Sequence, residues 1–353
     1  MNMKRVFSLL TAAVLALALT GCGSAPASAG RIGEVEIPAG LYLIMQLSAY
    51  NEAQSRMADP AGDPLTATIT INGEELSGTD YIAAATHEFL SDYAAVRTLY
   101  PQLGGVLSEE DKAQAARTAD ELWSTSGAHF EANGIGRESI GLYTEFAAQR
   151  QQMLELLYGA GGPMAVSPAA LDDYITQNYR QAKFVGFPLY DLTTYQALDD
   201  VGDAQVTELA QQAAERLGAG EDPAALAAEL LPPVYTMLGG QFTQEAAAAN
   251  SGVTVFTPGQ IEYYTSPEVR EQLLAAKPGD TLVVDVDSQR LALRMEPVAQ
   301  GEGEDIAALR PGALAEMKTA EMDDYLLEQG DALVWALDEA AVKAYSPKNI
   351  VSE

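Results

Sequence analysis

The chain is poor in the residues from which most catalytic and metal sites are built. Its 353 residues include one cysteine and two histidines. One cysteine cannot form an internal disulfide, and two histidines cannot supply a histidine-rich metal site, so we expect neither a metal ion nor another cofactor. Basic residues are also scarce, because 20 lysines and arginines stand against 50 aspartates and glutamates, a net charge of −30. Phosphate backbones bind basic stripes, so this balance argues strongly against a nucleic-acid-binding protein.

Long apolar runs are missing after the first 20 residues, so no later segment is predicted to cross a membrane. Hydrophobic residues still make up 48% of the chain, which is the composition of a globular protein rather than of a disordered one. The length predicts two or three domains, each with its own core.

The single cysteine lies at the end of an N-terminal export signal. Lys4 and Arg5 precede an uncharged apolar stretch, residues 6–19, that has the length of a signal-peptide core. The stretch ends in Leu-Thr-Gly-Cys, which resembles a bacterial lipobox. That resemblance implies a lipoprotein signal peptide over residues 1–21, a lipid-modified Cys22 and a flexible tether over residues 22–30, which would hold the protein on the extracytoplasmic face of the cell membrane. The alternative is an ordinary secretory signal cut within residues 25–29.

The next part of the chain is predicted to be mostly helical. Residues 31–37 suit a strand, Pro38 opens a helix, and residues 66–71 suit a strand before an Asn-Gly turn. Apolar residues then recur at helical spacing from Ile82 to Tyr100. Further helices are predicted from Ser108 to about residue 133, over residues 138–158, and from Ser167, with serine at the N-cap in two cases.

After Tyr179 the pattern becomes mixed. Strands are predicted at residues 182–190, 253–256, 281–286 and 291–295, and helices at residues 203–217, at residues 223–230 and from Ser266. Residues 300–304 form a linker, and helices return up to residue 328 and over residues 332–344. The sequence therefore predicts a mostly helical α+β fold: a helical domain (31–180), an inserted small α+β domain (181–299) and C-terminal helices that pack on the first domain (300–353).

The order of these segments, together with several short motifs, resembles the extracytoplasmic foldases of the PrsA/SurA type. In that family a parvulin-like module interrupts a helical chaperone domain. The motifs that carry the resemblance are residues 71–76 and 134–140 and the segment 166–179 in the helical part, and residues 220–227, 256–261 and 277–280 in the module. The resemblance covers nearly the whole mature chain and implies unfolded exported polypeptides as partners.

The module departs from the family at the prolyl isomerase pocket. Parvulins carry one histidine on the first strand and one on the last, whereas this chain has Phe184 at the first position and Arg290 or Leu291 at the second. Ile261 stands where the family has a methionine. Rotation about a peptide bond has a barrier of about 18–20 kcal/mol, and a polar pocket must favour the twisted amide to lower it. We therefore predict that isomerase activity is lost or weak.

Other candidate catalytic or metal-binding groups have simpler explanations. His87 and His129 lie in predicted helices without a recognisable nucleophile motif beside them. Asp285 and Asp287 would share one face of a strand, but they lack the spacing of a calcium loop and are more simply interpreted as solvated carboxylates.

Tyrosines are the most informative residue class, because there are 16 of them against 8 phenylalanines and 2 tryptophans. A tyrosine ring with its polar tip suits a wet groove that accepts varied peptides, and methionine suits an adaptable surface. A core position with a solvent-reaching hydroxyl explains the tyrosines equally well. The candidate peptide-binding residues are Tyr42, Met45, Tyr93, Tyr143 and Tyr174.

The leading hypothesis is a membrane-anchored, ATP-independent chaperone of exported proteins that favours basic clients, and a homodimer is compatible with the sequence. An extracellular solute-binding or receptor lipoprotein is the alternative, and it would be built from two α/β lobes. A structural envelope protein is a third class and predicts no groove.

Overall fold

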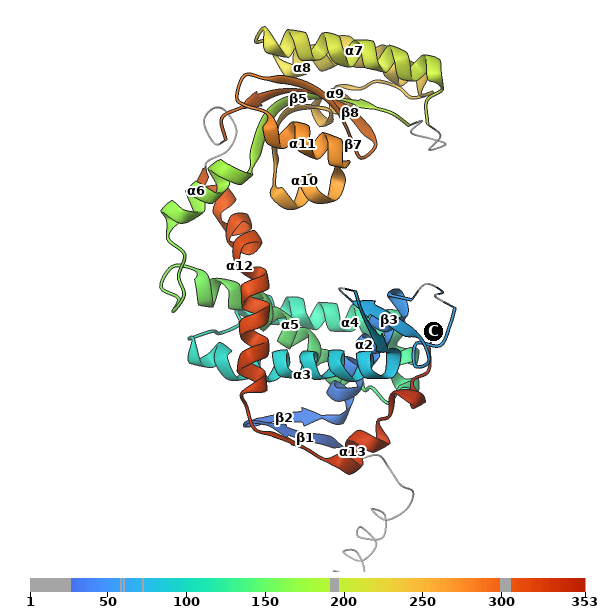
Figure 1. Cartoon of the computed structure of the whole chain (residues 1–353), viewed down its shortest axis with the longest axis vertical. Helices are drawn as coiled ribbons and strands as arrows, with labels where there is room; N and C mark the ends of the chain where they lie inside the picture. The colour runs from blue at the N-terminus through green and yellow to red at the C-terminus, as the bar shows by residue number, and fades with distance from the viewer. Residues whose placement is uncertain are drawn as a thin grey trace, which may run out of the picture. The chain divides into compact units, whose positions relative to one another are not determined.

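The computed structural model describes residues 27–57, 59, 61–71, 73–190, 197–298 and 306–352 (Figure 1). The signal peptide, Cys22 and the linker at residues 300–304 lie outside the described residues. The chain divides into two compact units. The helical unit contains the residues up to 157, residues 161–163 and the residues from 320 onward, and the inserted unit contains residues 158–160 and 164–319. The predicted mostly helical α+β fold with an inserted α+β module is confirmed.

The helical unit begins with two β-hairpins, each followed directly by a helix. The first comprises β1 (Ser28–Ile32), β2 (Val35–Pro38) and α2 (Ala39–Ser55), and the second β3 (Thr68–Ile71), β4 (Glu74–Ser77) and α3 (Gly78–Gln102). Two features differ from the sequence prediction. Residues 31–37 form two strands rather than one, because Gly33, with φ +58°, turns the chain. Ser28–Gly30, expected in the flexible tether, belong to β1.

The C-terminal segment adds a strand to the first hairpin. β9 (Trp335–Leu337) pairs antiparallel with β1, so the sheet has the order β2-β1-β9. The prediction of one helix over residues 332–344 was therefore wrong, and only α13 (Glu339–Ala344) is helical there. Asp338 stops the strand and starts the helix, because its carboxylate accepts hydrogen bonds from the N–H groups of Ala340 and Ala341. A short 3₁₀ turn, η1 (Pro347–Asn349), follows.

Three more helices complete this unit: α4 (Glu109–Ala132), α5 (Arg137–Tyr158) and the second half of α12 (Ile306–Asp331). The predicted start of α4 is correct, since the Ser108 hydroxyl accepts from the Asp111 N–H and the Asp111 carboxylate accepts from the Ser108 N–H. Within the described ranges, no helix is both long and apolar enough to cross a bilayer.

The inserted unit is a four-stranded antiparallel sheet with helices on both faces (Figure 1). Its strands run in the order β6-β5-β8-β7. The elements are α6 (Pro168–Asn178), β5 (Arg180–Pro188), α7 (Asp200–Gly218), α8 (Pro223–Met237), α9 (Gln244–Ala249), β6 (Ser251–Phe256), α10 (Pro258–Tyr264), α11 (Pro267–Ala275), β7 (Thr281–Val286) and β8 (Gln289–Glu296).

Alternation along β5 separates two cores. Val185 and Phe187 pack with α7 and α8 on one face, and Ala182 and Phe184 pack with α10 and α11 on the other. The unit also takes in α6 and the first half of α12, which the sequence analysis placed outside it. Two hydrogen bonds from Arg310 to the Asp172 carboxylate, at 2.7 and 2.9 Å, tie these two helices together.

Candidate functional site

A cleft of about 810 Å³ in the helical unit is the first candidate site and is called here the main cleft. It is lined from α2, α3, α5 and α12. Its apolar lining consists of Met45, Phe89, Tyr143, Phe146, Ala147 and Leu327, and its charged lining of Glu88, Asp92, Asp323, Asp324 and Arg150. An apolar lining with a predominantly acidic charged part suits a chain segment that carries both apolar and basic side chains.

Among the described residues that line the main cleft, Arg150 is the single cation. Its Nε lies 2.5 Å from Asp92 Oδ2 on α3, and its Nη2 lies 2.7 Å from Asp323 Oδ1 on α12. Burial raises the pKa of the Asp92 carboxyl although Arg150 acts in the opposite direction. Burial also opposes the charge of Arg150, but the two aspartates outweigh it and raise the pKa of the guanidinium. Burial therefore penalises the charged form of Asp92, and Arg150 offsets part of that cost.

Two further clefts of about 670 Å³ each adjoin the main cleft. The side cleft runs between α4 and α5 and shares Tyr143, Ala147 and Gln151 with the main cleft. The hairpin cleft lies between the β3–β4 hairpin and helices α2 and α3, and it shares Glu88 and Phe89 with the main cleft. Because neighbouring clefts have lining residues in common, the three lie side by side across the helical unit.

The structure brings together two of the five predicted peptide-binding residues. Met45 and Tyr143 both line the main cleft. Tyr42 and Tyr93 are only 6% and 3% exposed and lie in the core, and Tyr174 is in the inserted unit, where its ring meets that of Tyr179 edge-on. For Tyr42 and Tyr93 the core interpretation is therefore the one that the structure supports.

Several cleft residues were not singled out from the sequence. Phe89 was recognised only as a member of an inward helical stripe, and that stripe was a usable signal. Arg150, Asp323 and Leu327 gave no signal, because they reach the cleft from α5 and α12, which are far apart along the chain.

The positions that correspond to the isomerase pocket form an apolar face. Phe184, Ile261 and Leu291 belong to one cluster between the sheet and helices α10 and α11. Arg290 points to the other face, towards α7, because neighbours along β8 alternate. Of the two alternatives for the second position, Leu291 is the one on the face of Phe184.

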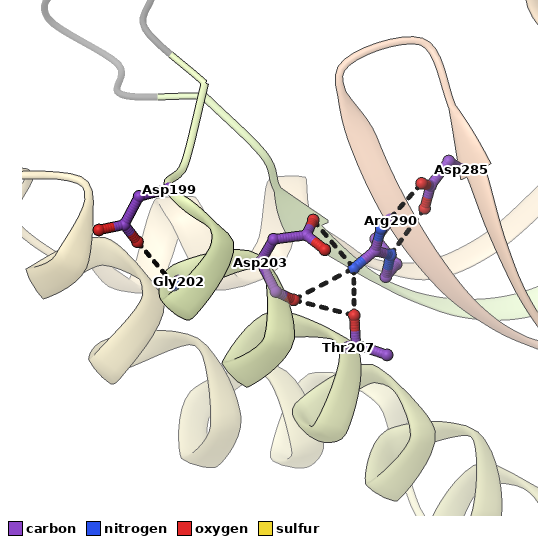
Figure 2. A network of polar contacts seen from close by, with 6 residues as sticks. All are labelled: Asp199, Gly202, Asp203, Thr207, Asp285 and Arg290. Carbon is purple, nitrogen blue, oxygen red and sulfur yellow. Dashed lines mark hydrogen bonds and ion pairs between the residues drawn. The ribbon is translucent and has the colours of Figure 1, made fainter.

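Arg290 has a structural role on its own face (Figure 2). Its guanidinium binds both carboxylate oxygens of Asp285 at 2.7 and 2.9 Å, the Thr207 hydroxyl at 2.5 Å and Asp203 Oδ1 at 3.2 Å. Its side chain is only 13% exposed, and the hydrogen bonds to Asp285 raise its pKa. Asp285, which the sequence offered as a possible metal ligand, thus pairs with Arg290. Arg290 in turn links α7 to the sheet.

Neither histidine is arranged for nucleophilic catalysis. His87 Nε2 lies 2.9 Å from Asp331 Oδ1, and its ring stacks on Trp335 with the centroids 4.2 Å apart. The Ser91 hydroxyl binds the same carboxylate oxygen. A catalytic relay needs the imidazole between serine and carboxylate, whereas here the carboxylate lies between them. His129 is near the end of α4, with its ring tilted against that of Phe130.

No family model matches the sequence, and no curated protein matches it. Solved structures similar to this chain include the foldase protein PrsA from Streptococcus pneumoniae, with 12% identity, coverage of 79% of this chain and 98% of that one, and a TM-score of 0.38. The foldase protein PrsA from Lactococcus lactis has 11% identity, coverage of 91% of this chain and 98% of that one, and a TM-score of 0.35. The peptidylprolyl isomerase PrsA from Bacillus anthracis has 12% identity, coverage of 69% of this chain and 94% of that one, and a TM-score of 0.27. Identities and TM-scores are low throughout, so the function is inferred below from this chain's own side chains.

Proposed function

We propose that this protein is an ATP-independent chaperone that holds unfolded exported polypeptides in the adjoining clefts of its helical unit. The observation that carries the proposal is the main cleft, whose lining combines apolar side chains with four carboxylates and one arginine, and which shares lining residues with two further clefts. A client segment would lay apolar side chains on Phe89, Tyr143 and Leu327, which are partly exposed, and place its basic groups near the carboxylates. The net charge of −30 would keep client complexes soluble.

The export signal and the lipobox-like end of its apolar stretch support placement on the extracytoplasmic face of the membrane, held by a lipid on Cys22.

The solute-binding alternative requires two α/β lobes. In the described part of this chain the four-stranded sheet lies in the inserted unit, and the strands of the helical unit form a hairpin and a small three-stranded sheet.

The first test is suppression of aggregation of reduced lysozyme, a basic client, at equimolar chaperone. Ala147 is exposed on α5 at the junction of the main and side clefts, so Ala147→Trp should block both without disturbing the core. Ala116→Trp is the matched control, because Ala116 is exposed on α4 and lines neither of these clefts. We expect suppression by the wild type and by Ala116→Trp, and a clear loss with Ala147→Trp. Absence of suppression by the wild type would refute the proposal.

The charge preference needs a separate variant. Asp323→Asn with Asp324→Asn removes two charges that line the main cleft, and Glu131→Gln with Glu339→Gln removes two exposed charges that do not line the clefts described above. With a labelled unfolded lysozyme peptide, anisotropy should show weaker binding and a smaller salt dependence for the main-cleft variant only. Equal effects of both variants would mean that only the net charge matters.

We also propose that isomerase activity is lost or weak. The cluster around Phe184, Ile261 and Leu291 consists of apolar residues, so it offers a twisted amide little polar stabilisation. A proline-containing tetrapeptide assay should give rates close to background at micromolar protein, and a rate well above background would overturn this part of the proposal.

A further inference from the structure

The two hairpin–helix segments repeat one another at a fixed offset. Ile32 corresponds to Ile71, and Tyr42 to Tyr81, each 39 positions further along the chain. The register agrees as well, since Ile32 pairs with Val35 and Ile71 pairs with Glu74 on the two sides of their turns. The chain therefore contains two copies of one structural element.

Only the first copy has a third strand. β9 pairs with β1 through Arg31 and its neighbours, and the Ala29 carbonyl accepts from the Asp338 N–H at 2.9 Å. In the second copy, β3 pairs with β4 alone within the described part of the chain. The positions in β3 that correspond to Ala29 and Arg31 are Thr68 and Thr70, and both are exposed.

The backbone of Thr70 points away from β4. In a hairpin with this register, the pair beside the turn exchanges hydrogen bonds, and alternate residues direct their N–H and C=O groups outwards. Ile69 and Ile71 thus pair with β4, whereas the outward backbone groups of Thr68 and Thr70 have no backbone partner among the described residues. Natural edge strands are commonly blocked by lysine or proline, and the Thr-Ile-Thr-Ile sequence of β3 has neither.

The hairpin cleft lies directly against this hairpin. Ile71 and Leu76 line it from the strands, and Glu88 and Phe89 connect it to the main cleft. A polypeptide bound in the main cleft and extended over Glu88 and Phe89 would therefore reach the hairpin. Glu52, Arg56 and Glu88 line the cleft, and Arg56 pairs with Glu52 at 2.7 Å. The lining keeps one net negative charge, which suits a basic segment, whereas a second copy of this chain would bring a net charge of −30.

We propose that β3 accepts an extended segment of the bound client as a third antiparallel strand, as β1 accepts β9. This inference rests on the proposed chaperone function. It assigns to the edge of β3 the part of client binding that does not depend on the client's sequence. Backbone hydrogen bonds would hold the segment whatever its side chains are, and the clefts would select apolar and basic residues.

Amide hydrogen exchange of the wild-type protein gives a direct test. The probe is reduced, carboxamidomethylated lysozyme, which stays unfolded. On binding, exchange of the Thr70 amide should slow by about tenfold or more, while the amides of Ile69 and Ile71, already bonded to β4, should change little. Unchanged exchange at Thr70 with bound client would refute the inference. Protection of Thr70 without client would refute it too, because a second copy or the chain's own tail would then occupy the edge.

Substitution gives an independent arm. Thr70→Pro removes the outward N–H without removing a bond to β4, and Thr70→Val keeps it as the matched control. We expect Thr70→Pro to weaken client binding by about tenfold relative to Thr70→Val, with equal thermal stability of the two variants. If both bind like the wild type while Ala147→Trp does not, strand addition is wrong and the cleft proposal stands. If the wild type binds no client, the chaperone proposal itself fails.

Discussion

Replacement of Arg150 by methionine should destabilise the helical unit in a pH-dependent way. Arg150 joins α5 to Asp92 on α3 and to Asp323 on α12. Methionine keeps the apolar stem of the side chain and removes its charge. The variant therefore leaves the Asp92 carboxylate without its ionic partner, although the side chain of Asp92 is only 19% exposed.

The expected size follows from this burial. Breaking a fully buried ion pair by removing one partner costs about 3–5 kcal/mol, and an exposed pair contributes below about 1 kcal/mol. Arg150 is 34% exposed and Asp92 is 19% exposed, so solvent screens part of the interaction. We expect a loss of about 2 kcal/mol in the free energy of unfolding near neutral pH.

The pH dependence has a definite sign. The folded-state pKa of Asp92 is raised, so the folded protein binds this proton more tightly than the unfolded chain, and stability falls as the pH rises through the interval between the two pKa values. Arg150 is the group that lowers this pKa, so its removal raises the pKa further and widens the interval. The deficit of Arg150→Met should therefore be small near pH 4 and full near pH 8.

Urea unfolding followed by tryptophan fluorescence can measure this effect, because Trp123 and Trp335, the two tryptophans, both lie in the helical unit. Adding Asp92→Asn to the variant should recover much of the loss, since it removes the unpaired charge. Arg97→Met is the control, as Arg97 also joins α3 to α5 but pairs with the more exposed Glu145. A loss below about 0.5 kcal/mol, or one equal at both pH values, would refute the reasoning.

Two further predictions concern backbone geometry and the sheet. Gly30→Ala should destabilise the helical unit more than Gly73→Ala in the same fluorescence assay. Both glycines have positive φ, so the backbone strain of an alanine is common to the two variants. A Cβ at Gly30 would lie 2.4 Å from the Ala336 carbonyl oxygen, whereas a Cβ at Gly73 would meet open space. Equal losses would mean that the β1–β9 contact has no steric role. Arg290→Met should lower the stability of the inserted unit by about 2 kcal/mol, seen as an earlier transition by far-ultraviolet circular dichroism with the tryptophan transition unchanged. A shift of the tryptophan transition instead would contradict the assignment of Arg290 to that unit.

Local signals in the sequence predicted most of the helices and strands. Ser108 and Ser167 each cap the helix that follows through a bond to a backbone N–H three residues further on, so the sequence alone contains the whole interaction. The hairpin around residues 72–73 is local in the same sense. The segment over residues 332–338 was mispredicted because its strand exists only by pairing with β1, about 300 positions away in the sequence.

Sequence alone determined the helix caps, the turns, the order of segments and the acidic balance, because each depends on residues within a few positions or on composition. Tertiary structure decided which side chains meet. It placed Tyr143 in the main cleft and Tyr93 in the core, although both lie on helical stripes. It set Leu291 rather than Arg290 beside Phe184, and it brought Arg150 between Asp92 and Asp323. These outcomes depend on the direction in which packed helices and paired strands turn each side chain, which the spacing along one segment does not fix.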